Sequence, residues 1–162
     1  MLPEQFKERM RNMLGAEYEE FQAALGKEEY HALRINPLKA DIAQALKKLP
    51  FLLRPVPWAE GGFYYEGQDQ PGKHPFHDAG VYYIQEPSAQ SAAALLAARP
   101  GERVLDLCAA PGGKSTQIAA CMAGRGILVC NEIHPARAKI LSENVERLGV
   151  RNAVVTNETP DR

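Results

Sequence analysis

The segment Arg103-Val-Leu-Asp-Leu-Cys-Ala-Ala-Pro-Gly-Gly-Lys-Ser-Thr-Gln-Ile-Ala-Ala120 decides the fold of this chain. Its apolar start predicts a buried strand, and the small residues at 109–113 predict a tight turn. Apolar residues then recur at Ile118 and Ala119 with the spacing of a helix. A turn between a strand and a helix lets backbone N–H groups approach a ligand at the positive end of the helix dipole.

A second strand follows in Gly126-Ile-Leu-Val-Cys-Asn-Glu132 and ends in a carboxylate. Glu132 comes about 20 residues after the glycines of the turn, the spacing at which a βαβ nucleotide site places an acid on the ribose hydroxyls. The two segments together therefore predict a pocket for a nucleoside cofactor.

Three interpretations compete for the turn. A phosphate loop of the Walker type would use Gly113-Lys114-Ser115, but Cys108 occupies its first glycine position and Pro111 removes an N–H. A dinucleotide fingerprint needs Gly-x-Gly-x-x-Gly, which the segment does not supply. S-adenosylmethionine (SAM) carries no phosphate, so it tolerates fewer glycines. The pattern favours SAM, and leaves open ATP or GTP and a purely structural turn.

The order of predicted elements divides the chain into two domains. Residues 1–86 form a small α+β domain, and residues 87–162 begin an α/β domain with a parallel sheet. In the first, we expect helices within 3–26 and at 42–48, strands at 32–37, 63–65 and 81–84, an edge strand at 51–58 and a polar loop at 67–80. In the second, we expect helices at 87–98 and 135–147 and strands at 103–108, 126–132 and 153–156.

The second domain shows three parallel strands, whereas a doubly wound sheet has about five or more. The usual order places the first strand in the middle of the sheet, so one side of Val104–Leu107 would lack a neighbour. We therefore expect a truncated Rossmann-like sheet in a fragment of a longer enzyme, with a complete small domain as the alternative. An exposed strand edge also predicts self-association.

Composition narrows the class of protein. The net charge is −1, with 10 Lys and Arg against 13 Asp and Glu in residues 1–86, so composition does not indicate a dedicated nucleic-acid binder. No apolar run is long enough to span a membrane, and the polar N-terminus contains no signal-peptide core. The three cysteines are an odd number and suit a reduced, cytoplasmic protein.

The residues at 105–114 (Leu-Asp-Leu-Cys-Ala-Ala-Pro-Gly-Gly-Lys) closely resemble the first motif of the Sun-type RNA cytosine-5 methyltransferases, the group that contains RsmB and RsmF. The segment at 83–89 resembles the one that precedes this motif in the RsmF-like branch, and 131–152 resembles the following stretch. Upstream, 33–39 and 56–58 resemble the family's N-terminal RNA-associated domain.

This resemblance implies SAM as the cofactor and RNA, with ribosomal RNA as the expected substrate of the full-length protein. It implies a set of cofactor-binding residues: Cys108, Ala109, Ala110, Pro111, Gly112, Gly113, Lys114, Glu132, Arg137, Asn157 and Thr159. The commoner family pattern offers an Asp to the adenine, where this chain has Asn157, Glu158 and Thr159, and the choice among these three stays open. Lys114 points toward the reaction centre in the family, with a surface lysine as the alternative.

The catalytic step of this family needs residues that the sequence does not supply. Methylation at carbon 5 of cytosine requires a thiolate to add at carbon 6, and the family takes its cysteines from motifs after the third strand. We expect Cys108, Cys121 and Cys130 to pack as small apolar residues, so no catalytic residue and no metal site is predicted. Trp58 and the tyrosines at 64, 65, 82 and 83 could stack on bases, but core packing is favoured.

Two rival functions remain at the level of sequence. The first is a non-catalytic module that binds RNA or a partner protein through the exposed sheet edge. The second, less favoured, is a nucleotide binder of the phosphate-loop type.

Overall fold

The protein forms two sheets in a computed structural model that describes residues 2–27 and 29–159. The first sheet is antiparallel, with the order β2-β3-β1-β4. Its strands are β1 (His31–Ile35), β2 (Arg54–Pro55), β3 (Gly62–Tyr65) and β4 (Tyr82–Ile84). The short strand β2 lies at an edge, as the two prolines of the segment 51–58 predict, because proline cannot donate to a ladder.

The second sheet is parallel, with the order β5-β6-β7. Its strands are β5 (Arg103–Asp106), β6 (Ile127–Asn131) and β7 (Ala153–Thr156), so the three predicted parallel strands are confirmed. Within the described residues β5 pairs with β6 alone, which leaves one edge of β5 without a neighbour. The mixed α/β fold with a parallel sheet is therefore the predicted one.

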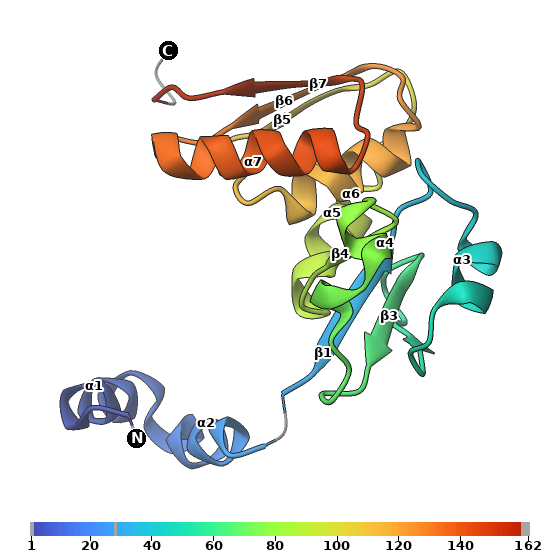
Figure 1. The fold of residues 1–162 in the computed structure, drawn as a ribbon. Helices are drawn as coiled ribbons and strands as arrows, with labels where there is room; N and C mark the ends of the chain where they lie inside the picture. Colours follow the sequence, from blue (N-terminus) through green and yellow to red (C-terminus); the bar gives the residue numbers. More distant parts are fainter. Residues whose placement is uncertain (1, 28, 160–162) are drawn as a thin grey trace.

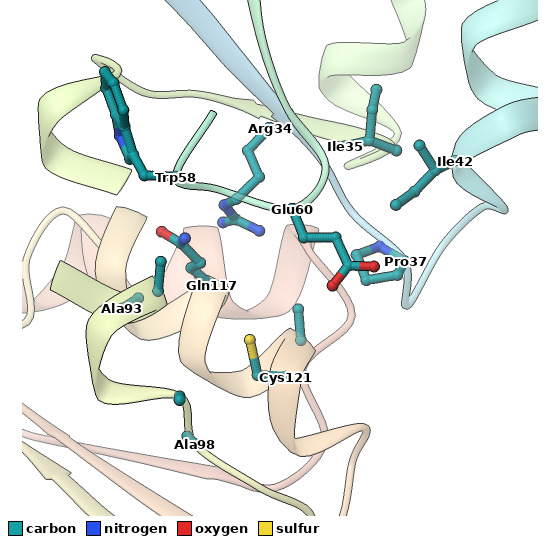
Figure 2. A pocket seen from close by; sticks show the side chains of 13 residues that line it. Arg34, Ile35, Pro37, Ile42, Trp58, Glu60, Ala93, Ala98, Gln117 and Cys121 are labelled. Carbon is teal, nitrogen blue, oxygen red and sulfur yellow. The ribbon is translucent and has the colours of Figure 1, made fainter. Parts of the chain in front are cut away.

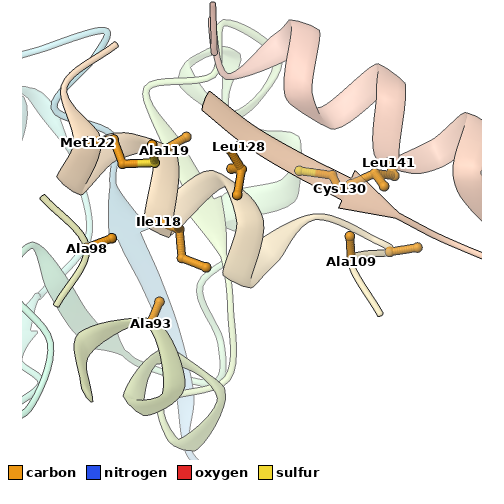
Figure 3. Close-up of a cluster of buried hydrophobic side chains, with 10 residues drawn as sticks. Ala93, Ala98, Ala109, Ile118, Ala119, Met122, Leu128, Cys130 and Leu141 are labelled. Atoms are coloured by element: carbon orange, nitrogen blue, oxygen red, sulfur yellow. The ribbon is translucent and has the colours of Figure 1, made fainter. Parts of the chain in front are cut away.

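Helices cover one face of the parallel sheet. These are α6 (Gly113–Met122) and α7 (Pro135–Arg147), while α5 (Ser91–Leu96) packs on α6, and Figure 1 shows α7 lying along the strands. Figure 3 shows the core between them, where Ile118 and Met122 of α6 lie near Leu128 of β6. On the opposite face Leu105, Ile127 and Val154 are exposed, although parallel sheets are usually covered on both faces.

The helix predicted at 87–98 is shorter in the structure. A 3-10 turn at Ser88–Gln90 leads into α5, which stops at Leu96 because Ala97 adopts a left-handed conformation with φ of 50°. The polar loop predicted at 67–80 contains two short helical turns, Pro71–Lys73 and α4 (Pro75–Asp78). Both begin with proline, whose fixed φ suits a first helical position.

The N-terminal helices lie apart from the two sheets (Figure 1). They are α1 (Glu4–Leu14) and α2 (Tyr18–Leu25), joined by a 3-10 turn at Gly15–Glu17. Their rings pack on each other, with centroids 6.4 Å apart for Phe6 and Phe21, and Arg11 lies over the ring of Tyr18. The remaining helix, α3 (Ile42–Lys48), begins where the side chain of Asp41 accepts a hydrogen bond from the backbone N–H of Gln44.

Buried hydrogen bonds join the antiparallel sheet unit to the parallel one. The side-chain amide of Asn36 donates to the carbonyl of Gly80 at 2.9 Å and to that of Leu148 at 2.8 Å. The chain approaches so closely here that a Cβ on Gly80 would overlap the carbonyl oxygen of Arg147. Arg147 itself donates to the carbonyl of His77. This contact fixes the start of β4 against the end of α7.

No helix of residues 2–27 and 29–159 has the length and apolar character that a membrane crossing requires.

Candidate functional site

The turn between β5 and α6 is shaped by the carboxylate of Asp106. One oxygen accepts the backbone N–H of Cys108 at 3.2 Å, and the other accepts the hydroxyl of Ser115 at 2.7 Å. Gly112 precedes α6 with φ of 111°, and a Cβ there would lie 3.2 Å from Cδ1 of Leu141. The turn therefore needs glycine for its conformation and has little space for a side chain.

Helix α7 holds the same turn from the side. Arg137 donates to the carbonyl oxygen of Ala110 at 2.8 Å, and Asn144 donates to that of Pro111 at 2.8 Å. These contacts occupy two carbonyl groups that the tight turn would otherwise leave to solvent. The backbone of the turn is thus fixed before any ligand arrives.

The carboxylate of Glu132 lies directly after β6. The residue is 3% exposed, and one of its oxygens accepts the backbone N–H of His134 at 3.1 Å. The other oxygen lies 3.5 Å from a guanidinium nitrogen of Arg137. Because Arg137 also contacts the carbonyl of Ala110, one side chain connects the buried acid to the turn.

The residues after β7 approach Glu132 in a defined order. Asn157 donates to the backbone carbonyl of Glu132 at 2.6 Å. Glu158 is held through its backbone, which donates to and accepts from the side chain of Asn131. For Thr159, the structure gives no hydrogen bond within the described residues. Of the three residues considered for an adenine contact, Asn157 is the one whose side chain bonds to the backbone of Glu132 within the described residues.

The turn also borders a hollow of about 210 Å³. Six of the predicted residues line it together with residues of β4 and the following segment: Cys108, Ala109, Ala110, Pro111, Gly113 and Lys114, with Tyr83, Ile84, Gln85 and Ala89. Gly112, Glu132, Arg137, Asn157 and Thr159 do not line this hollow. The structure thus brings six predicted residues together around the hollow and joins Arg137 and Asn157 to Glu132, while Gly112 lies against α7 and Thr159 has no such contact within the described residues.

Arg34 of β1 contacts the first turn of α6, and its sequence context assigned it no role in the site. Its guanidinium donates to the carbonyl of Gly113 at 3.4 Å, to the hydroxyl of Thr116 at 3.1 Å and to the side-chain oxygen of Gln85 at 3.3 Å. Burial lowers the pKa of Arg34 to about 10. The available signal was a single charged residue between two apolar strand residues, Leu33 and Ile35.

The cysteines differ from the sequence-based prediction in two of three cases. Cys108 and Cys121 are exposed, so the expectation that they pack as small apolar residues is wrong. Cys130 is buried in β6, and burial raises the pKa of its thiol to about 11. Across the described part of the chain, no three His, Cys, Asp or Glu side chains gather in a way that could hold a metal ion.

The aromatic residues that were expected in the core also differ in burial. Tyr82 and Tyr83 are buried, as predicted, and Tyr64 and Tyr65 are half-buried. Trp58 is 46% exposed, so the prediction that it packs in the core is wrong.

Comparison with known sequences finds two matching families. Residues 2–87 match the N-terminal domain of the 16S rRNA methyltransferase RsmF, and residues 93–160 match the family of the 16S rRNA methyltransferases RsmB/F. The ribosomal RNA small subunit methyltransferase F of Vibrio vulnificus (strain YJ016) is 39% identical over 96% of this chain and 35% of its own length. That of Escherichia coli O17:K52:H18 is 36% identical over the same shares. The chain thus spans about a third of the length of the curated relatives it matches.

Solved structures of related fold cover nearly the whole chain. A methyltransferase homolog from Pyrococcus horikoshii has a TM-score of 0.84 and 29% identity, over 98% of this chain and 53% of that protein. NSun6 from the same organism has a TM-score of 0.82 over 99% of this chain and 67% of that protein, and at 17% identity it bears on the fold alone.

Proposed function

Because the chain belongs to the family of the 16S rRNA methyltransferase RsmF, we propose that it is the SAM-binding part of a ribosomal RNA cytosine-5 methyltransferase. One observation carries this proposal. At the carboxyl edge of the parallel sheet, Arg137 connects the glycine turn after β5 to the buried carboxylate after β6. In open α/β sheets, ligands bind outside the carboxyl ends of the strands.

The residues at this edge fit the chemistry of SAM. The turn at 108–114 offers backbone groups and small side chains that let the methionine portion approach, and Gly112 keeps the turn close to α7. Glu132 offers a carboxylate to the ribose hydroxyls, and Asn157 or its neighbours Glu158 and Thr159 would lie by the adenine. When bound, SAM supplies an electrophilic methyl group on its sulfonium. The chain's own residues bind and orient this group.

Ser115 argues against a phosphate loop at the same turn. A phosphate loop offers this hydroxyl to a magnesium ion. Here Ser115 is fully buried and donates to Asp106 at 2.7 Å. Its hydroxyl therefore stabilises the turn and does not face a magnesium ion. A cofactor without phosphate groups suits this arrangement.

The cysteines support a binding role without catalysis for residues 1–162. Cys130 is enclosed in β6 with a raised pKa, so its thiol stays protonated at neutral pH. Cys121 lies near the end of α6, and Cys108 belongs to the turn that would wrap the cofactor. We therefore assign none of them the role of the thiolate that adds to cytosine, and we assign Lys114 at most a contributing role.

The two parts of the chain have different proposed partners. Residues 1–86 would contact ribosomal RNA in the whole protein, and residues 87–162 would hold the cofactor. The described residues contain free cysteines and no disulfide, which suits the proposed cytoplasmic location. We also propose self-association through the edge of β5 that has no neighbour among the described residues.

Calorimetric titration with SAM tests the cofactor assignment. We expect saturable binding by the folded chain and a loss of at least roughly tenfold in affinity for Gly112→Val, equal to about 1.4 kcal/mol. The matched control is Gly124→Val, since Gly124 also has a positive φ but no atom within 4 Å of an added Cβ. If Gly112→Val and Gly124→Val bind SAM equally well, the turn is not the cofactor site.

A second variant tests the acid. Glu132→Ala should weaken SAM binding by about 1–3 kcal/mol, the usual cost of losing a hydrogen bond to a charged group. Glu143→Ala, an exposed acid on α7, is the control and should bind SAM like the unsubstituted chain. Unchanged affinity in a folded Glu132→Ala variant would remove Glu132 from the site.

A further inference from the structure

A cavity of about 550 Å³ lies between β1, α5 and α6, away from the cofactor turn. Its volume falls in the range of about 300–1,000 Å³ that is typical of small-molecule sites. Much of its wall consists of alanines from α5, the segment that follows it and α6: Ala93, Ala94, Ala97, Ala98 and Ala120. Figure 2 shows the polar side chains that border it, with the guanidinium of Arg34 directed between Gln117 and Glu60. We call this cavity the Arg34 pocket.

Arg34 is a buried cation whose charge has no carboxylate partner among the described residues. It is 2% exposed, and its acceptors are the neutral oxygens of Gln85, Gly113 and Thr116. These bonds use Nε and Nη2, whereas Nη1 has no acceptor within residues 2–27 and 29–159. Buried charges are normally paired because desolvation of a lone ion is costly. The unused guanidinium nitrogen is therefore suited to an anionic ligand.

Trp58 supplies an aromatic surface to the same pocket. Its indole N–H donates to the carbonyl of Pro87 at 2.8 Å, which fixes the ring, while 46% of the residue stays exposed. A partly exposed, fixed indole is a suitable stacking surface for a nucleobase, since every base has a π face. Glu60 also borders the pocket.

We propose that the Arg34 pocket binds a nucleoside monophosphate, with the phosphate on the Arg34 guanidinium and the base against Trp58. The guanidinium matches the geometry of phosphate oxygens, and the alanine walls leave room for a planar ring. The ligand is either a free nucleotide or one nucleotide within a single-stranded RNA, because both present the same phosphate and base. The pocket shares no lining residue with the hollow at the cofactor turn, and Arg34 connects the two through its hydrogen bond to the carbonyl of Gly113.

Two reporters already lie in the pocket. Trp58 is the only tryptophan of the chain, so its fluorescence reports on this site alone. Cys121 is exposed and lines the pocket, whereas the other exposed cysteine, Cys108, lines the hollow at the cofactor turn. A ligand in the Arg34 pocket should quench Trp58 and protect Cys121 from iodoacetamide without protecting Cys108.

The experiment titrates the folded chain with AMP, adenosine, inorganic phosphate and a short oligoadenylate. We expect AMP to quench Trp58 saturably and to protect Cys121, and adenosine to bind at least roughly tenfold more weakly because it lacks the charge-assisted contact to Arg34. Tighter binding of the oligoadenylate than of AMP identifies RNA as the source, and the reverse identifies a free nucleotide. Absence of both responses with AMP and with the oligoadenylate, or equal binding of AMP and adenosine, would overturn the proposal.

A substitution that fills the pocket separates ligand binding from the support that Arg34 gives to α6. Ala94→Leu should weaken AMP binding by at least roughly tenfold by occupying the space of the ligand. Ala92→Leu, on the same helix but exposed and outside the pocket, should bind AMP normally. Ala120→Leu also lines the pocket, from α6, and replaces Ala94→Leu if that variant does not fold. Normal AMP binding by a folded pocket-filling variant contradicts the proposal, whatever its affinity for SAM.

Discussion

Asn36 joins the two sheet units through one side-chain amide. It is 1% exposed, and its two donor bonds reach Gly80 and Leu148, which lie 44 and 112 residues away in sequence. Asn36→Ala should lower the free energy of unfolding by about 1–3 kcal/mol, since two buried carbonyl groups lose their donor. Urea denaturation measures this change. Asn12→Ala, at an exposed position on α1, is the control, and equal stability of the two variants would contradict the role of Asn36.

Cys130 predicts a pH dependence of stability. Burial raises the pKa of its thiol from 9.0 to about 11. Between these pH values the unfolded chain has released the thiol proton while the folded chain retains it. The folded state then binds more protons, so the free energy of unfolding falls as the pH rises from about 9 to about 11.

The Cys130→Ala variant isolates this effect, because lysines and tyrosines titrate in the same range. The stability difference between the unsubstituted chain and Cys130→Ala should be constant below pH 9 and should shrink toward pH 11. Thermal melts across this range measure it. A difference that stays constant with pH would show that the thiol titrates alike in both states.

At the scale of elements, the spacing of apolar residues predicted those helices whose ends are set by nearby residues. The helices expected at 42–48 and 135–147 coincide with α3 and α7. The early end of α5 could not be predicted, because alanine favours helix and Ala97 turns left-handed in a folded context where Ala98 is buried in the core. Proline marked the start of both helical turns within 67–80, but their brevity gave no periodic signal.

The candidate site likewise contains residues that the sequence could indicate and contacts that it could not. The turn and Glu132 are readable from sequence because each lies at the end of a predicted strand. The contacts of Arg137 with Ala110 and of Asn144 with Pro111 cross 27 and 33 residues. Spacing along the chain carries no information about such pairs, and the same holds for Arg34, whose partners lie 51 to 82 residues away.

The N-terminal cap of α3 provides a test at this scale. Asp41 accepts the N–H of Gln44 at 2.9 Å, and Asp41→Ala should lower the stability of the protein by about 1 kcal/mol by leaving that donor without its partner. Asp41→Ser restores an acceptor and should recover most of the loss. Urea denaturation of both variants measures this, and an Asp41→Ala variant as stable as Asp41→Ser would contradict the cap.

At the scale of the whole molecule, the parallel sheet is asymmetric. Helices α6 and α7 cover one face, while Leu105, Ile127 and Val154 on the other face are exposed. Leu105 is 59% exposed and belongs to β5, the strand whose outer edge has no neighbour in the described residues. Apolar surface and unpaired backbone groups therefore occur together on this strand, and such an edge promotes pairing between chains.

We expect this arrangement to promote self-association that depends on concentration. Light scattering after size-exclusion chromatography should give a mass that rises above that of one chain as the loading concentration increases. Leu105→Lys places a charge on the edge strand and should return the mass to that of the monomer, because a buried lysine without a partner opposes pairing. Leu95→Lys is the matched control, since Leu95 is an exposed leucine of α5 outside the parallel sheet, and it should associate like the unsubstituted chain. A monomeric mass at every concentration would contradict the proposal that the edge of β5 is an interface. Association of the Leu105→Lys variant would show that the chains associate through another surface.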